Sequence, residues 1–393
     1  MWQQPPGRQE ADPVPPGEII FPLTAAVPLR PCIMPQTGRV RGAKQGRILA
    51  MTRSFAYLRR WLLLAGAAVL SSATALSPVP ARAQITPHPE RLAFVLNSAD
   101  ASISEIDIDS RREVRRVPVL REPHHMAVSP DGRSLVVGDT AGNALFFLDP
   151  ITGASQRHIP VSDPYQLSYS PNGRFLTLAG LARNQVDIYD VATMTLIHRV
   201  PASSMPSHIN YSPDSAVAYV SLQGSGKLMA IETATGKVRW ESRVGSTPAG
   251  VLWHEGRILV GVMGTDYVAV VDPADGRVER QLHMAAGPHN LFVQPSRKRL
   301  FVTCRVSGTI EQLDWNSLAI LRTYRLPGGP DDIVFGPNDT MWATLRWREH
   351  VAVVDLATGA ATLIPTGRSP HGIWLNTALP DRRLSMLIPR KPG

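Results

Sequence analysis

The sequence is poor in cysteine. Its 393 residues contain two, Cys32 and Cys304. Only Cys304 lies beyond residue 83, which excludes an intramolecular disulfide and a multi-cysteine metal cage in that part of the chain. No Cys-x-x-Cys-His motif is present, so covalent attachment of a c-type haem is excluded as well. Cys304 ends an apolar run over residues 300–304, and we interpret it as a buried core thiol.

The sequence also lacks the short motifs of common hydrolases. It has no Gly-x-Ser-x-Gly nucleophile elbow and no His-Glu-x-x-His zinc motif. Any catalytic site must therefore be assembled from residues that lie far apart in the chain.

An excess of charge of one sign is missing from most of the chain. The formal net charge is +9, but residues 1–83 carry 10 Lys and Arg against 3 Asp and Glu. That leaves 31 against 29 from Gln84 onward. Binding of nucleic acid depends mainly on neutralising phosphates, so the balanced charge after Gln84 makes nucleic acid an unfavourable partner.

The N-terminal region does not have the pattern of a folded domain. Residues 1–50 contain nine prolines and little hydrophobic periodicity. We expect this leader to be disordered, or not to be translated at all if synthesis starts at Met51 instead of Met1.

Residues 51–83 have the composition of a secretory signal peptide. Arginines, including Arg59 and Arg60, precede an apolar run over 61–70, and Ala81-Arg82-Ala83 forms a cleavage signal before Gln84. We therefore predict a periplasmic or secreted protein with no stable membrane span after cleavage. The alternatives are retention of the segment as a membrane anchor and export by the twin-arginine route.

A proline-led stretch recurs along the rest of the chain. Its first copy runs from Pro123 to Gly132 and joins a short apolar run to a Pro-Asp-Gly turn. The proline returns every 40–42 residues, at Pro164, Pro206, Pro248, Pro288, Pro330 and Pro370. A repeat of this length that contains strands is typical of propeller blades.

Each unit contains three apolar runs followed by a more polar fourth. In the first full unit these are Met126–Val128, Ser134–Gly138, Ala144–Leu148 and Ser155–Val161. The third run ends in an acidic residue in every unit, at Asp107, Asp149, Asp190, Glu232, Asp272, Asp314 and Asp355. An acid before a turn accepts backbone N–H bonds, so we interpret the seven carboxylates as hairpin residues and not as a metal array.

One unit lacks its first strand at the N-terminal end. Its other strands are predicted over Arg91–Leu96, Ser102–Ile108 and Glu113–Val119. We predict that His371–Leu375 supplies the missing strand and closes the ring, because closure removes exposed sheet edges. The predicted fold is an all-β, seven-bladed β-propeller of four-stranded blades over residues 90–375, followed by a basic tail over 376–393.

Several turns and strands carry a family resemblance. Ser-Pro-Asp-Gly at 129–132, Ser-Pro-Asn-Gly at 170–173 and the run Val353–Gly359 resemble the YVTN β-propeller repeats. That family includes periplasmic and cell-surface proteins, and related seven-bladed propellers include lactonases and haem-d1-associated proteins. Residues 254–256 and 295–298 depart from the turn motif, which we expect to alter two hairpins but not the closure.

In such propellers, the loop that enters each first strand opens at one mouth of the central channel. The residue after each leading proline is therefore expected to line that mouth, and the next residue to lie beside it. These 14 positions hold five of the 11 histidines. We predict a ligand pocket made by His124, His125, Tyr165, His208, His289, Asp331 and His371.

The predicted pocket has the chemistry of a transition-metal site. Imidazoles with a carboxylate suit zinc, copper or iron, and we predict His124, His289, His371 and Asp331 as candidate ligands. The same groups could serve as acid and base. Alternatively, the histidines only hydrogen-bond across a water-filled channel, or one of them is the axial ligand of a haem d1, which the family resemblance implies as a cofactor.

The loops between second and third strands are expected to open at the same mouth. They supply Asp139, Asn143, Arg183, Asn184, Asp266, Arg305 and the cluster Arg346-Trp347-Arg348-Glu349-His350. Within that cluster we predict Arg346, Trp347 and Arg348 as ligand-binding, because a tryptophan between arginines can hold an anionic or planar ligand. The predicted function is an exported binding or interaction propeller that takes a small molecule or a protein partner at its mouth. The alternatives are a lactonase-like hydrolase and a haem-d1-associated protein.

Overall fold

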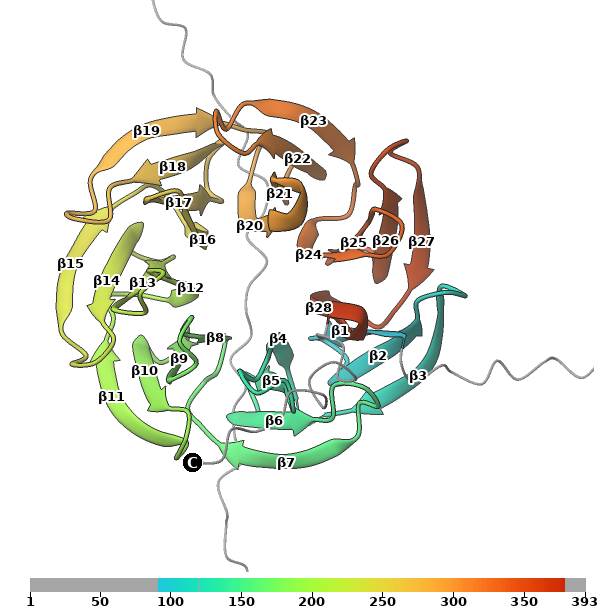
Figure 1. The fold of residues 1–393 in the computed structure, drawn as a ribbon, viewed down its shortest axis with the longest axis horizontal. Helices are drawn as coiled ribbons and strands as arrows, with labels where there is room; N and C mark the ends of the chain where they lie inside the picture. The colour runs from blue at the N-terminus through green and yellow to red at the C-terminus, as the bar shows by residue number, and fades with distance from the viewer. Residues whose placement is uncertain (1–90, 120, 379–393) are drawn as a thin grey trace, which may run out of the picture. The chain divides into compact units, whose positions relative to one another are not determined.

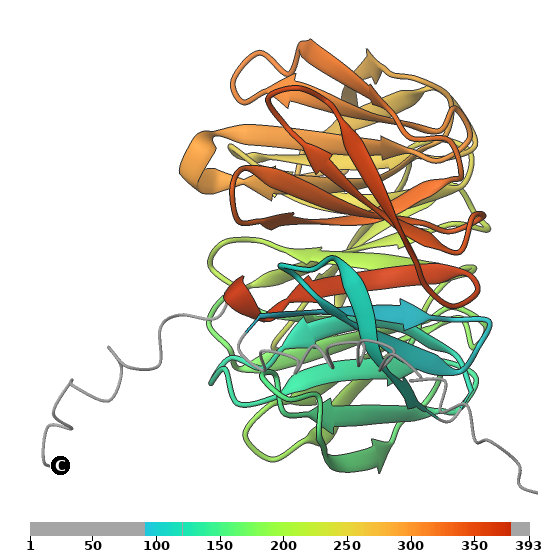
Figure 2. The same cartoon turned by 90° about the vertical axis from the view of Figure 1, so that its right-hand side faces the viewer.

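A computed structural model describes residues 91–119 and 121–378, which form seven four-stranded antiparallel sheets around a central axis (Figure 1). Figure 2 shows the same sheets from the side. The predicted leader, the predicted signal peptide and the tail beyond residue 378 lie outside the described residues. The prediction of a seven-bladed propeller is confirmed.

Each blade runs from an inner strand at the axis to an outer strand at the rim. The strands of the blade that contains the start of the described chain are β1 (Leu92–Asn97), β2 (Ser102–Asp107) and β3 (Arg112–Pro118). The others are β4 (Pro123–Val128), β5 (Leu135–Asp139), β6 (Ala144–Leu148), β7 (Ser155–Pro160), β8 (Gln166–Tyr169), β9 (Phe175–Gly180), β10 (Gln185–Asp190), β11 (Thr195–Pro201), β12 (Pro206–Tyr211), β13 (Val217–Leu222), β14 (Lys227–Glu232), β15 (Val238–Arg243), β16 (Pro248–His254), β17 (Arg257–Val262), β18 (Tyr267–Val271), β19 (Val278–His283), β20 (Pro288–Gln294), β21 (Arg299–Cys304), β22 (Thr309–Asp314), β23 (Ile320–Arg325), β24 (Pro330–Gly336), β25 (Thr340–Leu345), β26 (His350–Asp355), β27 (Ala361–Pro365) and β28 (Pro370–Leu375).

The ring is closed by strands from both ends of the described chain. β28 pairs antiparallel with β1, so that Ile373 lies opposite Val95 and Leu375 opposite Ala93 (Figure 1). The amide of Leu92 donates to the side-chain oxygen of Asn376 at 2.8 Å. This residue opens a short 3₁₀ turn, η2 (Asn376–Ala378). The predicted closure is thereby confirmed, and it leaves no sheet edge unpaired at the junction.

The hydrophobic core lies between neighbouring blades. Residues of one blade, such as Val186 and Ile188, pack against residues of the next, such as Val220 and Ile231. Second strands such as β5 and β13 are buried throughout, whereas the outer strand β7 is mostly exposed. This matches the predicted polar fourth run, because only the rim strand has a face without a neighbouring blade.

The acidic residue that ends each third strand fixes the following turn. Six of them accept backbone N–H bonds from residues two or three positions later, and Glu232 accepts the hydroxyl of Thr235 at 2.9 Å. The six are Asp107, Asp149, Asp190, Asp272, Asp314 and Asp355. The interpretation as hairpin residues is confirmed.

The two departures from the turn motif change only the local hairpins. Glu255 and Gly256 join β16 to β17 with φ of 45° and 79°. Two left-handed residues in a two-residue loop are typical of a type I′ turn, whose twist suits a tight hairpin. A 3₁₀ turn, η1 (Pro295–Arg297), joins β20 to β21 and ends at Lys298 with φ of 47°.

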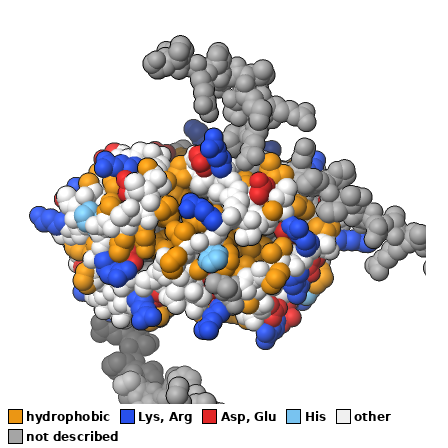
Figure 3. All heavy atoms as spheres, turned by 90° about the horizontal axis from the view of Figure 1, so that it is seen from below, with side chains coloured by type: hydrophobic (Ala, Val, Ile, Leu, Met, Phe, Trp, Pro, Cys, Tyr) orange, Lys and Arg blue, Asp and Glu red, His pale blue; other side chains and the backbone are white. Residues whose placement is uncertain are grey.

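Basic side chains are dispersed over the one face of the propeller seen in Figure 3. On the side shown in Figure 3, Lys and Arg are scattered among hydrophobic and neutral side chains and do not form one continuous stripe. Among the residues that the structure describes, no helix has the length and apolar character needed to span a bilayer.

Candidate functional site: a buried histidine cluster

The predicted pocket residues meet where the first strands begin, at one end of the axis. The register between β4 and β5 shifts between Pro123 and Met126, which is a β-bulge. Similar register shifts occur where β12, β16, β20 and β24 pair with their second strands. A β-bulge lets neighbouring side chains, which would otherwise alternate, point the same way. Consecutive residues His124 and His125 therefore both reach the axis, with ring centroids 4.8 Å apart. Pro123 pairs with Asp139 on the other side of this bulge, so β4 begins at Pro123 and not at the predicted Met126.

Hydroxyl groups bind the backbone amides that the bulges release. In three blades, a serine or threonine near the end of the second strand accepts the N–H of the second residue after the leading proline. The bonds are His208 to Ser221 (3.1 Å), Asn290 to Thr303 (3.1 Å) and Asp332 to Thr344 (3.0 Å). These hydroxyl residues are not among those predicted from the sequence, although their fixed place near the end of the second strand is a visible signal.

Three histidines form the centre of the cluster. Atoms able to bind a metal in His124, His125 and His371 all lie within 4.8 Å of one another. The His371 ring centroid lies 3.8 Å from that of His124 and 4.4 Å from that of His125. All three side chains are buried. Gly372 allows this approach, since a Cβ there would stand 3.1 Å from the His124 carbonyl oxygen.

The hydrogen bonds of His125 settle which of its nitrogens is free. Its Nδ1 lies 2.7 Å from the backbone carbonyl oxygen of Tyr165. A carbonyl only accepts, so His125 Nδ1 carries the proton and donates it. Its Nε2 is then a lone-pair nitrogen, and it is buried without a partner. Metal-binding histidines are commonly oriented in this way, with the other ring nitrogen donating to a carbonyl or carboxylate.

Asp331 lies at the centre of a second group of residues beside the three histidines, with His289, Arg305 and Arg346 around it. Its side chain is fully buried and accepts hydrogen bonds from Arg305 and, at 3.2 Å, from Arg346. His289 Nε2 lies 2.8 Å from Arg305, which can only donate, so this ring carries its proton on Nδ1. That Nδ1 is 2.9 Å from Asp331 Oδ1, close but not aligned as a hydrogen bond. His371 Nε2 lies 3.4 Å from the same carboxylate.

Two further predicted residues connect these two groups. The His208 ring stands edge-on to His125 at 5.4 Å and to His289 at 5.1 Å. Its Nδ1 is 3.1 Å from the hydroxyl of Ser207, while its Nε2 is buried without a partner. Tyr165 covers His124 with ring centroids 4.1 Å apart. Five histidines, one tyrosine and one aspartate, contributed by six of the seven blades, thus form one contiguous group.

Burial keeps the imidazoles of this cluster neutral. It holds the pKa values of His124, His208 and His371 well below the usual range, and lowers the pKa of His125 and His289 to about 4. The neutral form has the lone pair that a metal ion requires.

The two neighbouring carboxyl groups respond in opposite directions. Burial alone would raise the pKa of Asp331, but the Arg305 charge, with His371 and His289, outweighs it and holds that pKa well below its usual range. Burial, followed by the Asp331 charge, raises the pKa of Asp332 to about 7. Asp331 is therefore the permanent anion of the cluster.

The predicted Arg346-Trp347-Arg348 unit divides between two environments. Arg346 joins the cluster through Asp331. Trp347 is 59% exposed, and Arg348 donates weakly to the Pro327 carbonyl at 3.5 Å. Of these three side chains, Arg346 alone contacts the histidine cluster among the described residues. The second arginine that contacts the cluster is Arg305, through the same Asp331.

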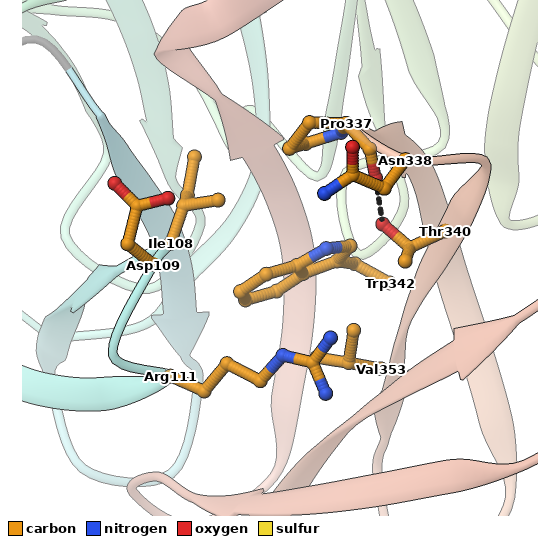
Figure 4. A pocket seen from close by; sticks show the side chains of 8 residues that line it. All are labelled: Ile108, Asp109, Arg111, Pro337, Asn338, Thr340, Trp342 and Val353. Atoms are coloured by element: carbon orange, nitrogen blue, oxygen red, sulfur yellow. Dashed lines mark hydrogen bonds between the residues drawn. The ribbon is translucent and has the colours of Figure 1, made fainter.

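A separate hollow of about 90 Å³ lies between the turns after β2 and β24 (Figure 4). Its charged groups are already paired, Asp109 with Arg91 at 3.1 Å and Arg111 with the Thr362 hydroxyl at 3.2 Å. Its centre is Trp342, which is buried to 1% exposure. Because its charged groups are paired within the fold, we place the candidate site at the histidine cluster.

Fold and cluster together define a seven-bladed propeller with a histidine-rich axial site. The chain belongs to the YNCE-like β-propeller family, whose family model matches residues 54–381. The resemblance to YVTN repeats therefore holds at the level of the propeller. None of the curated proteins compared with the chain matches its sequence.

Solved structures of other propellers share the fold. Dihydro-heme d1 dehydrogenase NirN in complex with DHE is 15% identical, with a TM-score of 0.56 and coverage of 76% of this chain and 78% of its own. A functionally unknown protein from Desulfotomaculum acetoxidans is 11% identical, with a TM-score of 0.63 and coverage of 72% and 98%. Virginiamycin B lyase from Staphylococcus aureus is 15% identical, with a TM-score of 0.55 and coverage of 64% and 90%. At these identities the likeness concerns the fold alone.

Proposed function

We propose that this YNCE-like propeller binds a transition-metal ion through His124, His125 and His371. The observation that carries the proposal is the convergence of three buried, neutral imidazoles whose ligand atoms lie within 4.8 Å of one another. The partnerless Nε2 of His125 supports it, because an unpaired polar atom in the interior costs free energy unless something binds it. Neutral imidazole suits zinc, copper or iron.

The proposed ligand set differs from the one inferred from sequence in one residue. His125 takes the place of His289, because the His289 lone pair is occupied by Arg305 at 2.8 Å. Asp331 is occupied by two arginines and acts beside His371 as an outer partner of the ion's ligands. Such outer carboxylates fix the orientation of a metal-binding imidazole.

The ring packing favours a single ion over a haem d1. The alternative from the sequence is a haem d1 with one of these histidines as its axial ligand. NirN, which shares the fold, is described in complex with DHE. Imidazole centroids 3.8 and 4.4 Å apart are in van der Waals contact, so a macrocycle does not fit between them. A lactonase-type reaction needs open access for an organic substrate, whereas these three rings are at most 5% exposed.

We further propose that the protein works outside the cytoplasm, as the signal-peptide pattern over residues 51–83 predicts. Its metal site would then take a small ligand or a protein partner at the mouth. Cell fractionation with N-terminal sequencing tests this: a mature N-terminus at Gln84 in the periplasm or medium is expected. An uncleaved protein in the cytoplasm would overturn it.

Elemental analysis and metal titration test the metal proposal directly. Protein purified without chelator or histidine tag is expected to carry about one transition-metal ion per chain. Replacing His124, His125 or His371 singly with Gln is expected to lower the affinity for Zn²⁺ by more than about 100-fold, since losing an outer partner already costs about 10–100-fold.

His283→Gln is the matched control for these variants. That histidine is 82% exposed on an outer strand, and its ion-pair partner among the described residues is Asp266. It is expected to leave the affinity unchanged, while circular dichroism checks that every variant folds. Full metal occupancy in a folded His371→Gln variant would show that the ion is held elsewhere.

A further inference from the structure

Two guanidinium groups lie beside the histidine cluster. Arg305 and Arg346 each follow the end of a second strand, β21 and β25, in adjacent blades. Their side chains are 14% and 22% exposed, whereas Asp331, which both contact, is fully buried. The arginines therefore occupy the layer between the buried cluster and the surrounding solvent.

Both arginines have donors to spare. A guanidinium carries five N–H donors. Among the described residues, the Arg346 guanidinium makes one hydrogen bond, through one terminal nitrogen to Asp331. Arg305 uses one terminal nitrogen for Asp331 and His289, and the other lies 3.7 Å from the sulfur of Met263. Its Nε is buried without a partner. Unused donors at a shielded site favour an acceptor with several lone pairs.

The charges around the proposed ion also call for an anion. The acidic groups that face the arginines are Asp331, Asp332 and Glu122, and the ligand imidazoles are neutral. A divalent ion added to two guanidinium groups leaves positive charge in excess even if all three acids are ionised. Three histidines also leave one position open on a four-coordinate ion.

We infer that the mouth binds a small organic carboxylate between Arg305 and Arg346, where one of its oxygens reaches the open position of the ion. This inference rests on the proposed function for the ion. A carboxylate fits because guanidinium groups recognise planar oxyanions through paired N–H donors. Asp331 already shows that one carboxylate can accept from both arginines. The shielded position of the arginines limits the ligand to a small one.

The experiment loads the purified protein with Co²⁺ and titrates it with acetate, reading the visible absorption of the cobalt. Acetate is expected to change the spectrum in a saturable way and to tighten Co²⁺ binding at least 10-fold, because the two ligands then stabilise each other reciprocally. Arg346→Gln is expected to weaken acetate binding at least 10-fold, measured with enough Co²⁺ to saturate the metal site in both proteins.

Two variants complete the design. Arg348→Gln is the control, because Arg348 lies in the same loop but does not contact Asp331, and it is expected to bind acetate as the wild type does. Arg346→Lys keeps the charge but loses the paired donors. It should weaken acetate binding to an intermediate degree, and it replaces Arg346→Gln if that variant does not fold.

The outcomes separate the two proposals. A Co²⁺ spectrum that ignores acetate, or acetate binding that survives Arg346→Gln, overturns the carboxylate site. A response to inorganic phosphate but not to acetate overturns the ligand class. Failure to bind Co²⁺ overturns the proposed function, and calorimetry on the metal-free protein then tests the anion. Acetate binding lost in Arg346→Gln would support the arginine site, and no binding would overturn it.

Discussion

At the scale of single residues, neighbouring histidines have different roles because their hydrogen-bond partners differ. His125 donates to a backbone carbonyl and keeps a free nitrogen, whereas His289 accepts from Arg305 and has no free lone pair. Both rings are buried, so burial alone does not distinguish them. The role of each ring depends on which nitrogen carries the proton and on whether the other nitrogen already has a donor.

Cys304 offers a prediction at the same scale. Burial, followed by the Glu311 charge, raises the pKa of this thiol, whose sulfur lies 3.8 Å from Glu311 Oε2. The thiolate is the reactive form, so a raised pKa and burial both suppress reaction. In a Cys32→Ser variant at pH 8, labelling by a thiol reagent is expected to be slower by about 100-fold or more in native than in denatured protein. Equal rates in the two states would contradict the buried position.

At the scale of elements, the β-bulges after the leading prolines create the site. A regular strand would send His124 and His125 to opposite faces, and the same holds for Asp331 and Asp332. The released amides would remain unpaired without hydroxyl groups such as Thr344. The inner strands therefore lack some backbone hydrogen bonds to their neighbours, and in return two consecutive side chains of a blade can point to the axis.

The closure of the ring gives an element-scale prediction. A chain ending at Arg368 lacks β28, and with it the buried side chains of Ile373 and Leu375. Their loss costs about 3–6 kcal/mol by transfer of apolar surface alone, and it exposes the edge of β1. We expect this truncation to aggregate or to melt more than 10 °C lower, since each kcal/mol shifts the midpoint by about 2–4 °C.

A chain ending at Ala378 is the matched control for this truncation. It keeps β28 and η2, and it should melt as the full chain does. A stable, monomeric propeller from the chain that ends at Arg368 would show that β28 is dispensable for closure. Thermal melting and size-exclusion chromatography distinguish these outcomes.

At the scale of the whole molecule, seven blades carry the candidate site at one end of the axis and the ends of the described chain at the other. Leu92 and Asn376 meet at one end of the β1–β28 pair, while Asn97 and Pro370 pair at the other end, near the cluster. The described chain thus begins and ends on the face away from the histidines.

The buried cluster makes the metal-free protein sensitive to acid. The folded pKa values of five histidines lie below the ordinary 6.5, so the unfolded chain takes up their protons first as the pH falls. Unfolding is thereby favoured between about pH 6.5 and 4. The raised pKa of Asp332 works in the opposite direction over the same interval, but it is one group against five.

Urea unfolding in the presence of a chelator measures this dependence. The urea midpoint is expected to be clearly lower at pH 5 than at pH 7. The free energy of unfolding falls by at most about 1.4 kcal/mol per pH unit for each uncompensated histidine. A midpoint that stays constant, or rises, between pH 7 and pH 5 would mean that the histidines are not buried and neutral in the folded protein.

Much of this architecture follows from the sequence by itself. The proline period, the four runs per unit and the acid before each turn specify blades through local interactions, and a unit without a first strand predicts the closure. The same period assigns the histidines to one mouth, because equivalent positions of a repeat lie at equivalent places in a ring. Blade geometry is a short-range property, so local pattern is sufficient to predict it.

Only the tertiary structure decided how the axial residues divide into partners. His371 meets His124 because closure brings the last inner strand beside β4. Arg305 and Arg346 both turn to Asp331, which removes His289 from the three-histidine group and separates Arg346 from Trp347. These choices depend on distances across the ring and on competition for buried hydrogen bonds. Neither quantity is contained in the spacing of residues along one chain.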